Sequence, residues 1–91
     1  MSSLSASTNY SITDENGRAS TISLPKLVAD VLQTVLPNVH LWIQETYDGV
    51  VRAYRGSLSR RETGNVVRRL AREEAQKHPL FDQLHKEVFD L

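Results

Sequence analysis

The residues best suited to chemistry are arginines, and they are concentrated in the middle of the chain. Seven of them lie within about twenty positions that contain a single acidic residue, Glu62: Arg52, Arg55, Arg60, Arg61, Arg68, Arg69 and Arg72. Spacings of i, i+4, i+7 and i+11 place four polar residues on one side of a helix: Arg61, Asn65, Arg68 and Arg72. This stripe predicts phosphate contacts through its three arginines, and the group as a whole indicates an anionic partner. For any single arginine, a solvated face with local ion pairs is the alternative interpretation.

The other chemically active residue types form no recognisable site. The chain has no cysteine, which excludes disulfides and thiolate metal ligands. The three histidines, His40, His78 and His85, lack metal-ligand spacing and are expected at the surface or at helix ends. No nucleophile motif or glycine-rich phosphate loop occurs. We therefore expect no enzyme activity, no cofactor and no metal.

Length and charge limit the class of protein further. Ninety-one residues form one small domain, a size that often gains stability by dimerising. Eleven basic and eleven acidic residues give a formal net charge of zero, which by itself gives no support to nucleic-acid binding. The basic middle and the acidic end of the chain predict two different surfaces. No apolar run approaches the ~20 residues of a membrane span, and no signal peptide is visible, so we expect a cytoplasmic protein without membrane contact.

A strand that runs directly into a helix is the first element expected to position polar side chains. Residues 18–25 alternate, with Ser20, Ile22 and Leu24 on one face and Ala19, Thr21 and Ser23 on the other. Period two predicts a half-buried strand. Pro25 ends it, because proline has no N–H to donate, and the same ring suits the first turn of a helix. A broad apolar stripe then predicts a helix over residues 25–36, which Pro37 ends or kinks.

Two pairings are open for this strand. Residues 10–13 also alternate, and a three-residue loop from Glu15 to a left-handed Gly17 would make a hairpin. Its register would pair Tyr10 with Ile22 and Ile12 with Ser20, leaving the apolar side chains on one face. Alternatively, residues 20–24 pair with the same strand of a second chain. Both can hold in one protein, because a strand has two edges.

The segment from 38 to 55 allows two interpretations. Apolar residues recur at i, i+3, i+4, i+7, i+8, i+11, i+12 and i+15 from Val39, which favours a helix with Asn38 as its N-cap. Asp48-Gly49 is also typical of a hairpin turn between two strands. The long-range periodicity favours the helix.

The rest of the chain is expected to be helical. Ser59 and Glu62 form a capping box at the start of a helix over residues 59–77, and a shorter helix follows over residues 80–91. The last helix either packs on its own domain or across a dimer, or it serves as a partner-binding arm. Three regions are therefore expected: a disordered tail at 1–9, a strand and helix region at 10–56, and a C-terminal helical extension at 57–91.

The strand, proline and helix order resembles a known family. Thr21-Ile22-Ser23-Leu24-Pro25, the helix that ends at Leu36, and a second helix that starts at Asn38-Val39 and contains Trp42-Ile43-Gln44-Glu45 are similar to ribbon-helix-helix proteins over roughly residues 18–54. These are small dimeric DNA-binding regulators, common as repressors and antitoxins. The resemblance implies a mainly α fold with a short β ribbon or hairpin, in a ribbon-helix-helix-like dimer with extra C-terminal helices.

The resemblance also implies roles for particular residues. The ribbon of such a dimer enters the major groove, which makes Ala19, Thr21 and Ser23 the base-contacting residues. The start of the second helix, at Asn38 and Val39, would hold a phosphate. The dimer interface is expected to include Ile22, Leu24, Val31, Trp42 and Ile43. At its helical spacing, Trp42 is more typical of a core residue than of a stacking platform.

A second resemblance competes with the first. A hairpin containing Asn16-Gly17-Arg18 before Ser23-Leu24-Pro25-Lys26 is similar to the swapped-hairpin transcription factors, another dimeric DNA-binding class. That family needs a second hairpin downstream, which residues 39–55 would supply only if they were strands.

Two functions of different classes follow. The first is a homodimeric regulator of repressor or antitoxin type that binds double-stranded DNA, as found in phages or plasmids, with a protein partner at its C-terminal helix. The second is a small protein-binding inhibitor or adaptor of phage or mobile-element type that acts on a host nucleoprotein without reading DNA. Zero net charge and the short side chains of the strand favour the second, and Thr21 and Ser23 would then be ordinary strand formers on an exposed face.

Overall fold

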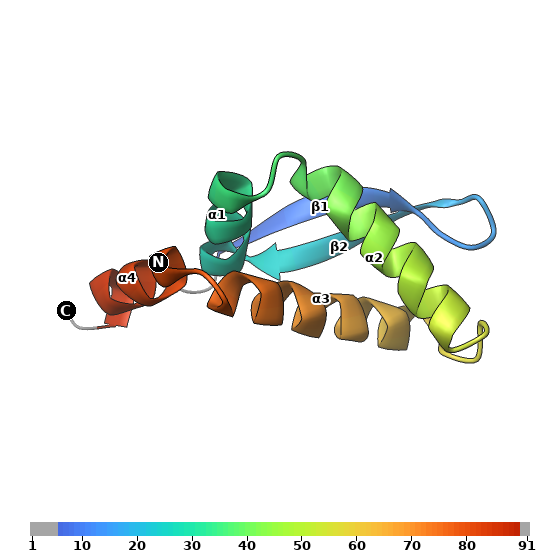
Figure 1. Ribbon diagram of the computed structural model, residues 1–91. Coiled ribbons are helices and arrows are strands. Elements are labelled where there is room, and N and C mark those ends of the chain that lie inside the picture. The colour runs from blue at the N-terminus through green and yellow to red at the C-terminus, as the bar shows by residue number, and fades with distance from the viewer. Residues whose placement is uncertain (1–5, 90–91) are drawn as a thin grey trace.

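A β-hairpin followed by four helices makes up the computed structural model, which describes residues 6–89. The elements are β1 (Ser7–Thr13), β2 (Ala19–Pro25), α1 (Lys26–Val35), α2 (Val39–Ala53), α3 (Arg60–Gln76) and α4 (Pro79–Phe89). One face of the hairpin is covered by helices: α2 contacts β1, α3 contacts β2, and α1 contacts both strands (Figure 1). The expected mainly α fold with a β-hairpin is confirmed.

The hairpin has the register that its turn chemistry predicts. Tyr10 lies opposite Ile22 and Ile12 opposite Ser20, and Gly17 has a φ of +77°. The Asp14 N–H donates to the Arg18 carbonyl at 2.8 Å and closes the three-residue loop. Because the side chains of a strand alternate, this register directs the apolar residues of both strands toward the helices.

One boundary is wrong. Residues 1–9 were expected to be a disordered tail, but Ser7–Asn9 belong to β1 and pair with Ser23–Pro25. Their composition offers little apolar surface, so the order comes from ladder hydrogen bonds to β2 rather than from burial. Residues 1–5 lie outside the described part of the chain, as do residues 90–91 of the last predicted helix.

The ladder fixes which backbone groups face the edges of the hairpin. The Asp14 N–H bonds to the Arg18 carbonyl at one end of the ladder, and the Lys26 N–H bonds to the Ala6 carbonyl at the other. In this register the hydrogen-bonded pairs of residues are therefore the even-numbered ones. In an antiparallel pair, the residues between these direct their N–H and C=O groups away from the partner strand. The outward-directed groups of β2 therefore belong to Ala19, Thr21 and Ser23.

Side chains of α2 occupy the outer edge of β1 near the hairpin loop, at Ser11 and Thr13. The Gln44 amide accepts from the Thr13 N–H at 2.8 Å and donates to the Thr13 carbonyl at 2.9 Å. His40 Nε2 makes a hydrogen bond with the Ser11 carbonyl. A side chain of α2 thus takes the place of a neighbouring strand along this edge.

The segment from Val39 to Ala53 is a single helix, which confirms the interpretation from periodicity. The alternative interpretation as a pair of strands is wrong. The second hairpin that the resemblance to swapped-hairpin transcription factors requires is therefore not formed by residues 39–55. Asn38 is the N-cap and accepts from the Leu41 N–H, and Ser59 with Glu62 forms the predicted capping box of α3. Local cap chemistry therefore sets the start of both long helices.

The apolar faces of the elements meet in one core. Its fully buried members include Ile22, Leu24, Val31 and Ile43, four of the five residues expected at a dimer interface. These four pack within the single chain and offer no surface to a second copy unless they leave this core. Trp42, the fifth, is half-buried and packs against the core. An apolar stripe does not tell whether its own chain or a second one covers it.

The last helix packs on its own chain. Leu80, Phe81 and Leu84 of α4 lie against the core, and α4 contacts α1 and α3. None of the helices in residues 6–89 combines the length and the apolar character that a membrane crossing requires.

The amide of Gln44 provides a test of how the β1 edge is closed. Replacing Gln44 by Ala removes both bonds to Thr13, so the free energy of unfolding is expected to fall by about 1–2 kcal/mol. Urea unfolding followed by circular dichroism measures the change. The matched control is Gln76→Ala, at an exposed position of α3, for which we expect a change below about 0.5 kcal/mol. Equal effects of the two variants would contradict this role of Gln44.

Candidate binding surface of the hairpin and the third helix

The hairpin face that turns away from the helices forms the first part of the candidate site. We call it the outer face, and it consists of Ser7, Asn9, Ser11, Thr13, Ala19, Thr21 and Ser23. Ala19 and Thr21 are exposed, and Ser23 is half-buried beside Asn9, whose Oδ1 accepts from the Ser23 hydroxyl at 2.5 Å. All three residues expected to contact bases therefore share one uncharged surface of small hydrogen-bonding side chains.

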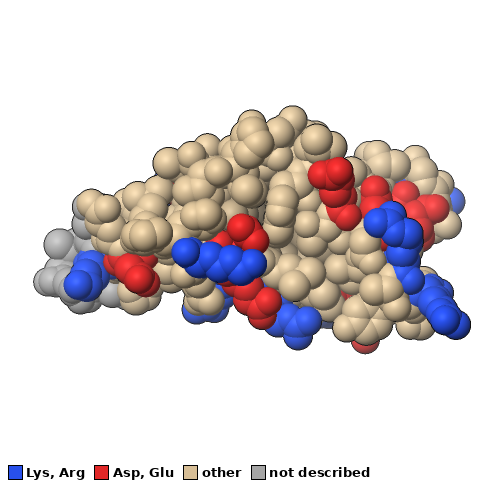
Figure 2. Space-filling model, in the orientation of Figure 1, with Lys and Arg blue, Asp and Glu red and all other residues tan. Residues whose placement is uncertain are grey.

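The two edges of this face have different neighbours. The N-terminus of α2 lies along β1, as the contacts of His40 and Gln44 with the strand show. Asn38, one of the expected phosphate contacts, uses its side chain to cap α2, and Val39, the other, is 7% exposed. Arginines of α3 lie along β2 on the opposite edge. On the face seen in Figure 2, basic side chains lie at the end of the molecule where α2 ends and α3 begins, and others lie along the lower side, with acidic side chains beside both groups.

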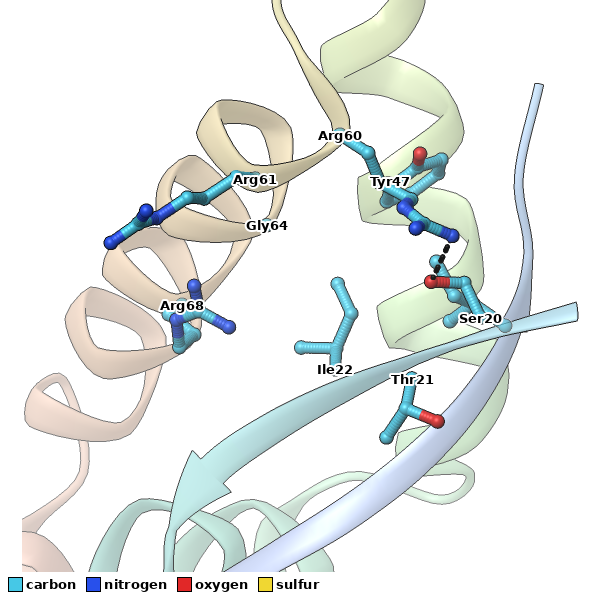
Figure 3. Close-up of a pocket in the computed structure, with 9 residues that line it drawn as sticks. Ser20, Thr21, Ile22, Tyr47, Arg60, Arg61, Gly64 and Arg68 are labelled. Atoms are coloured by element: carbon cyan, nitrogen blue, oxygen red, sulfur yellow. Dashed lines mark hydrogen bonds between the residues drawn. The ribbon is translucent and has the colours of Figure 1, made fainter.

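A groove of about 330 Å³ separates β2 from α3. Its lining residues come from four elements: Ile12, Ser20, Thr21, Ile22, Tyr47, Arg60, Arg61, Gly64 and Arg68. Figure 3 shows Ile22 beneath the space between the helices, while Arg60 and Arg68 point toward β2 and Arg61 extends along the outside of α3. The groove, called the β2–α3 groove below, therefore combines a strand edge, an apolar floor and the two guanidinium groups of Arg60 and Arg68, with Arg61 at its margin.

The arginines of the groove are held by neighbouring polar groups. Arg60 Nη1 donates to the Ser20 hydroxyl at 3.2 Å and lies 3.9 Å from the Asp14 carboxylate. Arg68 donates to Asn65 Oδ1 and lies across Gly64, where an added Cβ would come within 3.6 Å of its guanidinium. That distance is an ordinary van der Waals contact, so the Arg68 guanidinium packs against the helix surface at Gly64.

The predicted arginine stripe divides between two environments. Arg61 and Arg68 line the groove, whereas Arg72 is exposed and is not among the residues that line it. Sequence reasoning missed Arg60 as a groove residue, because the i, i+4 pattern begins one position later. It also missed Gly64 as a lining residue of the groove.

Two contacts join the hairpin loop to the helices. Tyr47 is fully buried on α2 and its hydroxyl donates to Glu15 Oε1 at 2.9 Å. Burial, assisted by the neighbouring Glu15 carboxylate, raises the pKa of Tyr47 to about 12. The Tyr47 hydroxyl therefore remains a neutral donor throughout the physiological range. Asp14 and Arg60 form the second contact, between the loop and α3.

The Asp14 carboxylate is stabilised mainly by the backbone. Its Oδ1 accepts from the N–H groups of Arg18 and Asn16, each at 2.9 Å. The bond from Arg18 is the largest effect that lowers the pKa of Asp14 below 3.8, with smaller contributions from Asn16 and Arg60. The loop next to the groove is therefore built around an ionised carboxylate.

Comparisons with known proteins give no assignment. No family model matches the chain, and neither the curated proteins nor the solved structures include a significant match. The resemblance to ribbon-helix-helix proteins thus stays a prediction, and any function must be argued from the surface itself.

The ionised Asp14 predicts a specific pH dependence. Because the pKa of Asp14 is lower in the folded than in the unfolded chain, its contribution to stability is present above the unfolded pKa, about 3.9. That contribution is lost as the pH falls through the lower folded value. Asp14→Asn keeps an acceptor oxygen but removes the charge. In this variant the free energy of unfolding should therefore fall less steeply between pH 5 and pH 2 than in the wild type. Urea titrations at several pH values measure the difference. A carboxyl carbon resonance of Asp14 that titrates at or above 3.8 would contradict the argument.

Proposed function

We propose that this chain binds double-stranded DNA by placing the outer face of its hairpin in the major groove, as a cytoplasmic transcriptional regulator of repressor or antitoxin type. The observation that carries the proposal is the composition of the outer face. Its side chains are short and uncharged, and most carry a hydroxyl or an amide that can meet base edges.

The dimensions of the hairpin fit this role. Adjacent strands lie about 4.8 Å apart, and the major groove, about 12 Å wide, admits a two-stranded ribbon. In this protein both strands come from one chain, because β2 pairs with β1. In a homodimer, each chain would place its own hairpin in a separate half-site, with the half-sites about 34 Å apart.

The neighbours of the two edges suit the walls of the groove. A ribbon in the major groove has a phosphate backbone along each side. Beside β2, the guanidinium groups of Arg60, Arg61 and Arg68 would meet one backbone. Beside β1, the N-terminus of α2 and His40 would meet the other, since helix N-termini favour anions. Groups able to meet phosphates would thus lie on both sides of the proposed base contacts.

A charge placed on the outer face tests where DNA lies. Thr21→Glu puts a carboxylate where the groove would receive the hairpin, so the affinity for a random-sequence duplex should fall at least tenfold. Fluorescence anisotropy of a labelled duplex at 50 mM salt measures the affinity. Thr34→Glu adds the same charge at an exposed position of α1 and is expected to weaken binding less than threefold. No binding by the wild type, or equal losses in the two variants, would refute the proposal.

The salt dependence of binding tests the phosphate contacts. Arg61→Gln should reduce the slope of log affinity against log salt by about 1, because one phosphate contact releases about one counterion. Arg69→Gln is the control: Arg69 is exposed on α3 but does not line the β2–α3 groove, and its removal should leave the slope unchanged within error. A slope that neither substitution alters would place the phosphate contacts elsewhere.

A further inference from the structure

The two edges of the hairpin differ in a way that DNA binding by the outer face does not require. The end of the β1 edge nearest the loop is occupied, because Gln44 bonds both backbone groups of Thr13 and His40 bonds the Ser11 carbonyl. The outward N–H and C=O groups of Ala19, Thr21 and Ser23 form the edge of β2, and within residues 6–89 no side chain or further strand bonds to them. An edge strand with unused ladder groups is a template for another extended chain.

The open edge forms one wall of the β2–α3 groove. Helix α3 lies beside β2, and both elements run in the same direction along the molecule (Figure 1). Between them, Ile22 gives the groove an apolar floor, and Gly64 leaves room on the helix side (Figure 3). A strand edge on one side and a helix on the other is the arrangement in which extended peptides add to a sheet.

The charge of the groove defines what it can hold. Three of its nine lining residues are arginines and none is acidic, although Asp14 lies 3.9 Å from Arg60 just outside it. We propose that the β2–α3 groove binds an acidic, extended segment of a partner protein, which adds to the open edge of β2 as a third strand. This inference concerns a protein partner and rests on the open edge of β2, although it shares Arg60 and Arg68 with the DNA-binding proposal.

The spacing of the arginines defines a sequence pattern for the partner. Arg60 and Arg68 are eight positions apart on α3, about 12 Å along the helix axis. Four residues of a strand span about 13.5 Å, and every second side chain lies on the same face. Two carboxylates four positions apart, with an apolar residue midway above Ile22, therefore match the groove. The pattern is acidic-x-apolar-x-acidic.

The alternatives fit the groove less well. A second copy would bring its own β2, which has no acidic residue, and would place its own three arginines near the first set, so like charges would repel. The phosphate backbone of DNA could pair with the guanidinium groups, but it has no donors for the outward carbonyl groups of β2. An acidic peptide satisfies both the charges and the alternating donors and acceptors of the edge.

A designed peptide and a proline substitution test the proposal. The probe is acetyl-Ser-Glu-Thr-Val-Thr-Glu-Ser-amide, and its binding to the full chain is measured by isothermal titration calorimetry at 50 mM salt. Thr21→Pro removes an N–H that points outward and takes no part in the β1–β2 ladder, a change that edge strands tolerate. We expect it to weaken binding at least tenfold. Thr21→Val keeps the N–H, so its loss of affinity should be much smaller than that of the proline variant.

Charge and backbone contacts are tested separately. Arg68→Gln, and a probe with both Glu residues replaced by Gln, should each weaken binding at least tenfold. If Thr21→Pro fails to fold, the wild-type chain is titrated instead with a probe whose central amides are N-methylated, and the same loss is expected. The proposal is overturned if the probe does not bind, or if binding survives both the proline and the N-methylation. A wild-type chain that sediments as a dimer with exchange-protected Thr21 and Ser23 amides would assign the edge to a second copy and would equally overturn it.

Discussion

Burial of one face of the hairpin is the constraint on which the rest of the structure depends. Ile12, Ile22 and Leu24 all face the helices, and each is at most 4% exposed. A shift of one residue in the register would turn these side chains to solvent, so the pairing of β1 with β2 is fixed by the same interaction that forms the core. Once the side chains of the even-numbered residues face inward, the side chains of the odd-numbered residues form the outer face. The backbone groups of the same odd-numbered residues form the edges.

The helices give the two edges their separate properties. Helix α2 lies close enough to β1 for Gln44 to bond both backbone groups of Thr13, which removes this end of the edge as a pairing site. Helix α3 starts from its own capping box and brings arginines toward β2 without bonding to the strand backbone. The difference arises from side-chain length and type: an amide can substitute for a peptide group, whereas a guanidinium has donors only.

Much of the fold, but little of the candidate groove, could be predicted from the sequence. Gly17 and the alternation around it were sufficient for the register, and caps at Asn38 and Ser59 were sufficient for the starts of two helices. The order of Ser7–Asn9 could not be predicted, because it depends on pairing rather than on apolar surface. The groove could not be predicted either, since Ser20 and Arg60 are forty positions apart and meet only through tertiary packing.

The contacts of the hairpin loop have a consequence for recognition. Tyr47 bonds Glu15 from one side and Arg60 approaches Asp14 from the other, so the tip of the hairpin is attached to two different helices. A free ribbon of two strands would lose conformational entropy on docking, and that loss would weaken any complex it forms. In this protein the hairpin becomes ordered when the chain folds, so its two strands lose little further conformational entropy when they bind a partner.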